Sequence, residues 1–174
     1  SMSRPLRSTI LRWPAALGFF WSIGRYSLTV IDRGTFQVGL ITIYSIWSEN
    51  SYCQRRKVGA LIVKDKMIIS DGYNGTPSGF ENVCEDDNNV TKPYVLHAEA
   101  NAITKLARSN NNSEGSTLYV TASPCIECSK LIIQAGIKRV VYAEKYRLTD
   151  GLSLLKRAGI KVIYLNPNEN DESK

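Results

Sequence analysis

The spacing of hydrophobic and polar residues changes several times along the chain, and from residue 40 onward it predicts alternating strands and helices. The runs 58–63 and 67–71 are short and rich in β-branched residues, and the polar residues 64–66 between them are typical of a β-hairpin. After a long loop over 72–94, rich in Gly, Asn and Asp, apolar residues recur at helical spacing over 97–109. Strands and helices then alternate to the end of the domain.

Nine elements follow from this pattern. Helices are expected over 40–50, 97–109, 125–135 and 150–158, and strands over 58–63, 67–71, 117–120, 139–143 and 162–165. Two adjacent strands followed by strand–helix alternation predict an α/β domain over 39–166, with helices flanking a mixed sheet. A polar tail over 167–174 follows this domain.

Residues 1–38 form an atypical basic and apolar extension without a helical or strand period. A basic start, an apolar run over 13–23 and a single acidic residue are features of a signal or transit peptide. The run is too short to span a bilayer and contains Pro14, Gly18 and Ser22. The other two interpretations are a tag remnant at residues 1–2 joined to a non-native extension, and a loosely packed arm. All three stay open.

Composition and charge narrow the classes of function. A chain of 174 residues, 43% of them hydrophobic, can bury the core of one ordinary domain without disulfide bonds. The net charge of +6 suggests an anionic partner, but residues 1–38 hold five arginines and one acidic residue, a net +4. The remaining 17 basic and 15 acidic residues leave +2 for the domain. This near balance favours a pocket for a small anion over a nucleic-acid track.

One histidine and two cysteines provide the candidate chemistry. His97 opens one expected helix, and Cys125 and Cys128 form a Cys-x-x-Cys pair at the start of the next. A helix N-terminus stabilises thiolates, the form of cysteine that binds metal. One imidazole and two thiolates leave the fourth position of a tetrahedral Zn²⁺ open for water, as in catalytic sites. Glu99, two residues after His97, is then the acid/base that moves the proton.

Each half of this pattern has a simpler interpretation. A Cys-x-x-Cys pair alone is also typical of a redox pair or of half a structural zinc site, and a lone histidine is more often a packed core residue. Together, and with Pro124 before Cys125, the two halves match the His-x-Glu…Pro-Cys-x-x-Cys signature of zinc-dependent nucleobase deaminases. The joint pattern favours a catalytic zinc site, because the only histidine of the chain lies where the signature needs it.

At these positions the sequence resembles the deoxycytidylate (dCMP) deaminase family of the cytidine deaminase-like superfamily, from about residue 47 to residue 165. The motifs that carry the resemblance are Val-Gly-Ala at 58–60, Gly-Tyr-Asn-Gly-Thr-Pro at 72–77, His-Ala-Glu-Ala-Asn-Ala-Ile at 97–103, Tyr-Val-Thr at 119–121, Pro-Cys-Ile-Glu-Cys at 124–128, Gln-Ala-Gly-Ile-Lys at 134–138 and Glu-Lys-Tyr at 144–146. The resemblance implies a three-layer α/β/α sandwich with a mixed five-stranded sheet.

The resemblance also implies a reaction and its contacts. A zinc-bound hydroxide attacks C4 of the cytosine ring of dCMP, Glu99 protonates N3, and dUMP and ammonia are the products. The implied substrate contacts are Ala98 at the base carbonyl, Asn74 at the sugar, Tyr146 near the pocket and Arg147 at the phosphate. A plain surface role is the alternative for Tyr146 and Arg147. The basic turn 55–57 is either a further phosphate contact or a solvated run of charge.

Assembly and regulation are implied by the same resemblance. Members of the family are commonly homohexamers that dCTP activates and dTTP inhibits. Gly72, Tyr73 and Gly75 then lie near an effector site, and the two glycines allow the backbone to approach a nucleotide closely. We expect a cytoplasmic homo-oligomer with a nucleotide substrate and with neither a membrane nor a nucleic acid as partner.

Cys53 and Cys84 are not part of the zinc signature. Some members of the family use cysteines near these positions, together with histidines, in a second zinc site, but this chain has no further histidine. A cysteine pair with other ligands, a disulfide and two buried thiols are the alternatives. Buried thiols are the expectation, because free cysteine packs as a small hydrophobic residue.

Other functions compete with that of a dCMP deaminase. Deaminases of another cytosine or purine nucleoside share the signature, and a polynucleotide deaminase acts on a base turned out of its strand. The polynucleotide reading requires a basic groove with aromatic residues, which the charge balance of the domain argues against. A zinc module without catalysis is the third class, and Glu99 argues against it because a structural site needs no acid/base.

Overall fold

The computed structural model of the chain describes residues 33–165. The polar tail 167–174 and, apart from its last six residues, the expected extension 1–38 lie outside the described residues. The helices are α1 (Arg33–Ser48), α2 (Ala98–Leu106), α3 (Ile126–Gln134) and α4 (Asp150–Arg157), and the strands are β1 (Gly59–Lys64), β2 (Met67–Tyr73), β3 (Thr117–Ala122), β4 (Arg139–Glu144) and β5 (Lys161–Tyr164).

The five strands form one mixed sheet in the order β2-β1-β3-β4-β5. Strand β1 is antiparallel to both β2 and β3, whereas β3, β4 and β5 are parallel to one another. Asp65 and Lys66 join β1 to β2 with φ values of 50° and 64°, as a two-residue type I′ hairpin turn requires. This architecture confirms the predicted α/β class with a mixed five-stranded sheet.

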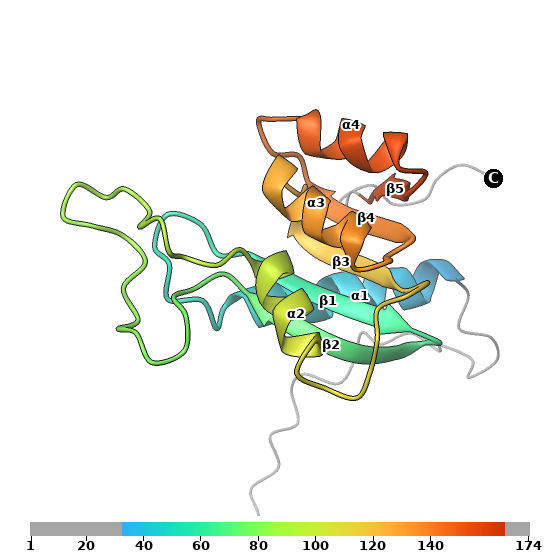
Figure 1. Cartoon of the computed structure of the whole chain (residues 1–174), viewed down its shortest axis with the longest axis horizontal. Helices are drawn as coiled ribbons and strands as arrows, with labels where there is room; N and C mark the ends of the chain where they lie inside the picture. The colour runs from blue at the N-terminus through green and yellow to red at the C-terminus, as the bar shows by residue number, and fades with distance from the viewer. Residues whose placement is uncertain (1–32, 166–174) are drawn as a thin grey trace, which may run out of the picture. The chain divides into compact units, whose positions relative to one another are not determined.

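Helices cover both faces of the sheet (Figure 1), because side chains along each strand alternate between two hydrophobic cores. The strand residues that face the core under α2, α3 and α4 are Ala60, Ile62, Leu118, Val120, Val140 and Tyr142. Those between them, Leu61, Val63, Tyr119, Val141 and Ala143, face the core under α1. The predicted three-layer α/β/α sandwich is therefore confirmed. Among the described residues, no helix combines the length and the hydropathy that crossing a membrane requires.

Helix α1 begins at Arg33, well before residue 40, where the pattern predicted its start, and ends at Ser48 rather than at residue 50. Its first residues therefore belong to the stretch that was assigned to an aperiodic extension. Gly34 and Gly39 lower the intrinsic helix propensity of this stretch. Leu40 and Tyr44 are four residues apart and are buried against the sheet, and this tertiary packing outweighs the weak local preference.

Cys53 and Cys84 form a disulfide bond, with an S–S distance of 2.04 Å, so the expectation of two buried free thiols was wrong. The carboxylate of Glu85 accepts hydrogen bonds from the backbone N–H groups of Gln54 and Arg55 and brings the two segments together. The two cysteines are 31 residues apart in sequence, so no local pattern reveals this contact. The bond attaches the loop after β2 to the segment before β1.

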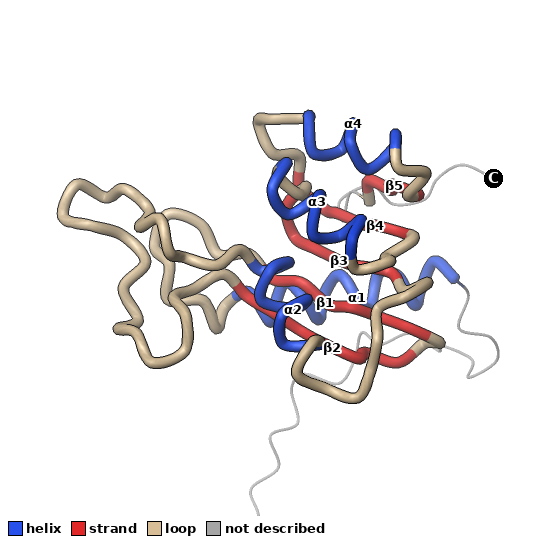
Figure 2. The backbone as a smooth tube through the Cα atoms, viewed as in Figure 1, coloured by secondary structure: helices blue, strands red, loops and turns tan. Residues whose placement is uncertain are grey.

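The loops that follow β2, β3 and β4 and the segment that precedes β1 gather at one end of the sheet (Figure 2). Antiparallel pairing places the start of β1 beside the end of β3, with Ala60 opposite Val120. Parallel pairing places the end of β4 there too, with Ala122 opposite Glu144. Helices α2 and α3 also begin at this end of the sheet. In open α/β sheets, ligands generally bind just outside the carboxyl ends of the parallel strands, so this end is the expected place for a site.

Helix α2 packs closely on β2 at Gly72. A Cβ atom added to Gly72 would lie 2.4 Å from the carbonyl oxygen of Ala98 and 2.6 Å from the backbone nitrogen of Ala102. Real Cβ atoms do not approach backbone atoms this closely, so only glycine fits under the first turns of the helix. This contact sets the distance between the sheet and the helix that starts after His97.

We predict that replacing both Cys53 and Cys84 by Ser lowers the free energy of unfolding by about 3–4 kcal/mol, because the bond closes a loop of some thirty residues. Urea denaturation of the double variant and the wild type, each with and without a phosphine reductant, measures the difference. We expect the reductant to lower the free energy of unfolding of the wild type and to leave that of the double variant unchanged, because the variant has no disulfide bond to reduce. A wild type that does not respond to the reductant would show that the two thiols are free.

We predict that Gly72→Ala lowers the free energy of unfolding by about 1–3 kcal/mol, because the added methyl group forces the backbone of α2 away from the sheet. Gly75→Ala is the matched control three residues later, since nothing lies within 4 Å of a Cβ atom there. Urea denaturation measures both variants. Equal stabilities of the two variants would contradict the close packing of α2 on β2.

Candidate metal and catalytic site

Two helix N-termini carry the residues of the zinc signature. His97 is the N-cap residue of α2 and Cys125 is the N-cap residue of α3, and both have extended backbone conformations. The sulfur of Cys125 accepts a hydrogen bond from the backbone N–H of Cys128 at 3.5 Å. The unpaired N–H groups of the first turn and the helix dipole favour negative charge on this sulfur.

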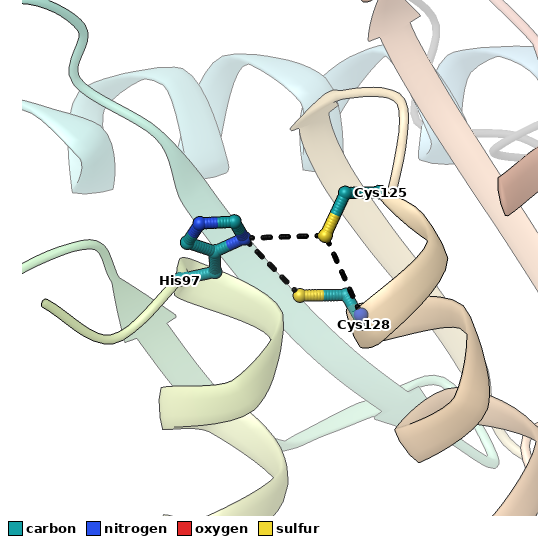
Figure 3. Close-up of side chains that lie close together, drawn as sticks. All are labelled: His97, Cys125 and Cys128. Carbon is teal, nitrogen blue, oxygen red and sulfur yellow. Dashed lines mark hydrogen bonds between the residues drawn. The ribbon is translucent and has the colours of Figure 1, made fainter. Parts of the chain in front are cut away.

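The three candidate ligand atoms converge on one point (Figure 3). His97 Nδ1 lies 3.5 Å from Cys125 Sγ and 3.4 Å from Cys128 Sγ, and all three ligand atoms lie within 4.8 Å of one another. A tetrahedral zinc ion with bonds of about 2.3 Å to sulfur and about 2.0–2.1 Å to nitrogen would hold nitrogen and sulfur about 3.5 Å apart. The two nitrogen–sulfur distances therefore match those of a tetrahedral zinc site.

The pKa values of the two thiols are shifted in opposite directions. Hydrogen bonds from Cys128 and His97 lower the pKa of Cys125 to about 3. The hydrogen bond with Cys125 and burial raise the pKa of Cys128. The hydrogen bond with Cys125 raises the pKa of His97 against the opposing effect of its burial. Cys125 is therefore the thiol that ionises more readily, and a bound cation favours the thiolate form of both cysteines.

Glu99 lies in the first turn of α2 with only 4% of its surface exposed. Burial raises the pKa of its carboxyl group. Glu99 lines the same cavity as His97 and Cys125 but is not a member of the convergent ligand set. A buried carboxyl group with a raised pKa beside an open metal position is suited to accept and release a proton.

His97, Glu99 and Cys125 line a cavity of about 360 Å³. We call the lining residues around them the floor of the cavity, namely His97, Ala98, Glu99, Ala122, Ser123 and Cys125. Four cations that also line the cavity are called its mouth, namely Arg55, Arg56, Lys145 and Arg147. The other lining residues are Cys53, Val58, Asn74, Glu85, Thr91, Val95 and Tyr146. The cavity combines a metal-binding floor with a cationic mouth, which suits a small anionic ligand.

The structure brings the four predicted substrate contacts together in this cavity, since Asn74, Ala98, Tyr146 and Arg147 all line it. The side chain of Asn74 is also structural. Its Oδ1 accepts a hydrogen bond from the N–H of Val58 at 2.7 Å, and its Nδ2 donates to the carbonyl of Arg56 at 2.8 Å. Asn74 therefore fixes the segment that carries the basic turn.

The predicted effector residues do not line the cavity. Gly72 is buried under α2, and the carbonyl of Tyr73 accepts a hydrogen bond from Asn101 Nδ2 at 2.9 Å. Gly75 forms an isolated β-bridge with Leu96, just before His97. All three residues contact the segment that leads into α2 or α2 itself, and their role toward an effector stays a prediction.

Sequence reasoning missed Ser123 and Glu85. Ser123 is buried, and its Oγ accepts a hydrogen bond from the N–H of Tyr146 at 2.7 Å, while its own N–H donates to the carbonyl of Glu144. Glu85 supports the backbone of the basic turn. The contacts of both residues join positions that are far apart in sequence, so no local pattern predicts them. For Ser123 the sequence offers one signal, its position directly before Pro124 and Cys125. For Glu85 it offers none.

A convergent His/Cys/Cys set with a buried carboxyl group close to it, at the end of an α/β/α sandwich, is the arrangement of the cytidine deaminase-like zinc hydrolases. The family described as "Cytidine and deoxycytidylate deaminase zinc-binding region" matches residues 41–144. The chain belongs to this family, as its motifs predicted.

Individual relatives agree with this assignment. The chain is 41% identical over 118 residues to the Bacillus subtilis protein named ComE operon protein 2, and this match covers 64% of the chain and 61% of the relative. The chain is 38% identical over 140 residues to the deoxycytidylate deaminase of Saccharomyces cerevisiae, and this match covers 75% of the chain and 45% of the relative. The chain thus spans less than two thirds of either relative. A crystal structure of the dCMP deaminase from cyanophage S-TIM5 with dCMP and dUMP is 44% identical, with a TM-score of 0.75, and covers 77% of this chain and 99% of that one.

We predict that the purified chain carries about one zinc ion and that Cys125→Ser abolishes its retention, because the variant lacks one of the two thiolates. Zinc is measured by atomic absorption after gel filtration. The double variant Cys53→Ser/Cys84→Ser is the control and retains the metal, since these sulfurs are bonded to each other. Loss of zinc from the control but not from Cys125→Ser would place the metal elsewhere.

Proposed function

We propose that the chain catalyses the hydrolytic deamination of dCMP to dUMP and ammonia. The observation that carries this proposal is the buried Glu99 carboxyl beside the convergent His97, Cys125 and Cys128, at the floor of a cavity with a cationic mouth. The cyanophage dCMP deaminase, whose structure contains dCMP and dUMP, and the yeast deoxycytidylate deaminase support the substrate.

His97, Cys125 and Cys128 would hold the zinc ion of the family. When bound, a zinc ion with an open position supplies Lewis-acid chemistry that lowers the pKa of a water molecule to about 7. Glu99 takes one proton from the attacking water and transfers it to N3 of the ring. It then takes the second proton from the hydroxyl group now bound to C4 and delivers it to the leaving amine, so that ammonia leaves and the C4 carbonyl of dUMP forms. Its buried position suits this role, since burial raises the pKa of the carboxyl toward the working range of a proton carrier.

The start of α2 orients the base. Ala98 is the first residue of the helix, is fully buried and lines the cavity. Its backbone N–H has no partner within the helix, as is general for first-turn N–H groups, and it is available to the carbonyl oxygen of a cytosine.

The cationic mouth binds the phosphate in this proposal. Arg55, Arg56, Lys145 and Arg147 line it, whereas Lys57, the last residue of the basic turn, pairs with Glu49 and does not line the cavity. Arginine forks match phosphate oxygens in geometry and charge. The four cations at the mouth favour a mononucleotide over a nucleoside as the substrate.

The regulatory and assembly properties implied by the family stay predictions for this chain. We expect a homohexamer that dCTP activates and dTTP inhibits, with Gly72, Tyr73 and Gly75 near the effector. The contacts of these three residues with the start of α2 support the idea, because a nucleotide bound there would act on the helix that carries His97 and Glu99.

We predict that the zinc-loaded chain releases ammonia from dCMP and that Glu99→Gln lowers kcat by about 10²–10⁴-fold while zinc is retained, since the amide cannot carry the proton. Ammonia release is followed on dCMP, deoxycytidine, dCTP and a cytosine-containing oligonucleotide, with zinc content measured in parallel. A zinc-loaded wild type that is inert on every cytosine nucleotide would falsify the proposed function. Activity on the oligonucleotide alone would identify a polynucleotide deaminase instead.

A further inference from the structure

We propose that Glu144 is a positioning residue that holds the guanidinium of Arg56 at the mouth of the cavity, and that this held arginine selects substrates with a 5′-phosphate. The inference rests on the proposed function, because it assumes that the cavity binds a cytosine nucleotide. The inference goes beyond the proposed function, because it names the residues that distinguish a nucleotide from a nucleoside. These are Arg56, one of the four cations, and Glu144, the carboxylate that holds it.

Arg56 is the only one of the four cavity cations for which the described residues provide an ion pair. Its Nη2 lies 2.6 Å from Glu144 Oε2. Glu144 is the last residue of β4 and is not part of the cavity lining, whereas Arg56 is. The carboxylate therefore acts on the cavity through the arginine and has no contact with a ligand of its own.

The ring of Tyr146 supports the same guanidinium from a second side. Arg56 Cζ lies 5.5 Å from the centroid of this ring, within the range of a cation–π contact. Tyr146 is fixed in turn by the hydrogen bond from its N–H to the buried Ser123. Ser123 thus connects the segment with Glu144 and Tyr146 to the floor of the site, because it directly precedes Pro124.

The backbone of Arg56 is held as well. Its carbonyl accepts a hydrogen bond from the side chain of Asn74 at 2.8 Å, which connects it to the loop after β2. By contrast, Arg55 makes a single side-chain hydrogen bond of 3.3 Å, to Thr91. The ammonium of Lys145 lies over the ring of Tyr164, 4.8 Å from its centroid. Among these three cations, Arg56 is the best preorganised.

Preorganisation determines how strongly a cation binds phosphate. A free arginine loses much of its side-chain freedom when it binds, whereas a guanidinium that is already fixed loses little. Arginine has five N–H donors, and the contact with Glu144 occupies Nη2, so donors on the rest of the fork stay available to phosphate oxygens. Loss of Glu144 should therefore weaken phosphate binding, although it makes the mouth more positive.

The test compares dCMP with deoxycytidine, which lacks the phosphate. We expect Glu144→Ala to raise KM for dCMP about tenfold with kcat changed less than twofold, and to leave kcat/KM for deoxycytidine unchanged. Glu144→Gln, whose amide oxygen still accepts a hydrogen bond from Arg56, restores KM to within about threefold of the wild type. Glu49→Ala is the matched control, since it removes the acid that pairs with Lys57 on the same basic turn, 3.1 Å away, and it leaves both substrates unaffected.

A double-mutant cycle separates positioning from direct binding. Arg56→Ala lowers the preference for dCMP over deoxycytidine at least as much as Glu144→Ala does, and the double variant shows no further loss, because both changes remove one function. A lower KM for dCMP in Glu144→Ala would overturn the proposal, since it would mean that the carboxylate competes with the phosphate. Equal losses on both substrates would overturn it as well and indicate a structural role. A wild type inactive on dCMP would instead refute the proposed function itself.

Discussion

The pairing of β1 with β3 is the interaction on which the site depends. Because β1 is antiparallel to β3 while β3 and β4 are parallel, the start of one strand and the ends of two others meet at one end of the sheet. Helix α2 is held there by the close approach of Gly72 to Ala98, and α3 begins directly after β3 and its short turn. The His97 imidazole and the Cys125 and Cys128 thiols converge because this end of the sheet brings two helix N-termini together.

The floor of the cavity carries the acidic and metal-binding side chains, and the mouth carries the cations. The floor therefore suits the base of a nucleotide, and the mouth suits its phosphate. The floor combines helix N-termini with the sulfur of Cys125 and the buried Glu99, an environment that stabilises the Cys125 thiolate and keeps a proton carrier out of bulk water. The mouth holds four cations, of which Arg56 is fixed by Glu144 and Tyr146. Ser123 joins the two parts, because it precedes Pro124 and Cys125 and binds the backbone on both sides of Lys145.

The fold and the floor of the site could be predicted from the sequence because their signals are local. Short apolar runs rich in β-branched residues indicated the strands, and the spacings His97-x-Glu99 and Cys125-x-x-Cys128 indicated the ligand set and the acid/base beside it. The start of α1 could not be predicted in this way, because Gly34 and Gly39 weaken its local preference and packing on the sheet supplies the stability. The Cys53–Cys84 bond and the contact of Arg56 with Glu144 join residues 31 and 88 positions apart, and only the folded chain shows such pairs.

In the proposed site, two thiolates and one imidazole hold a metal whose fourth position stays open to a small ligand. X-ray absorption at the zinc edge, on the zinc-loaded full chain with all four cysteines present, tests it most directly. We expect two sulfur neighbours at about 2.3 Å and two nitrogen or oxygen neighbours at about 2.0–2.1 Å. We also expect dUMP to perturb the nitrogen and oxygen neighbours and to leave the sulfur neighbours unchanged. A shell of three or four sulfurs would contradict it, because the metal would then be closed off as a structural site.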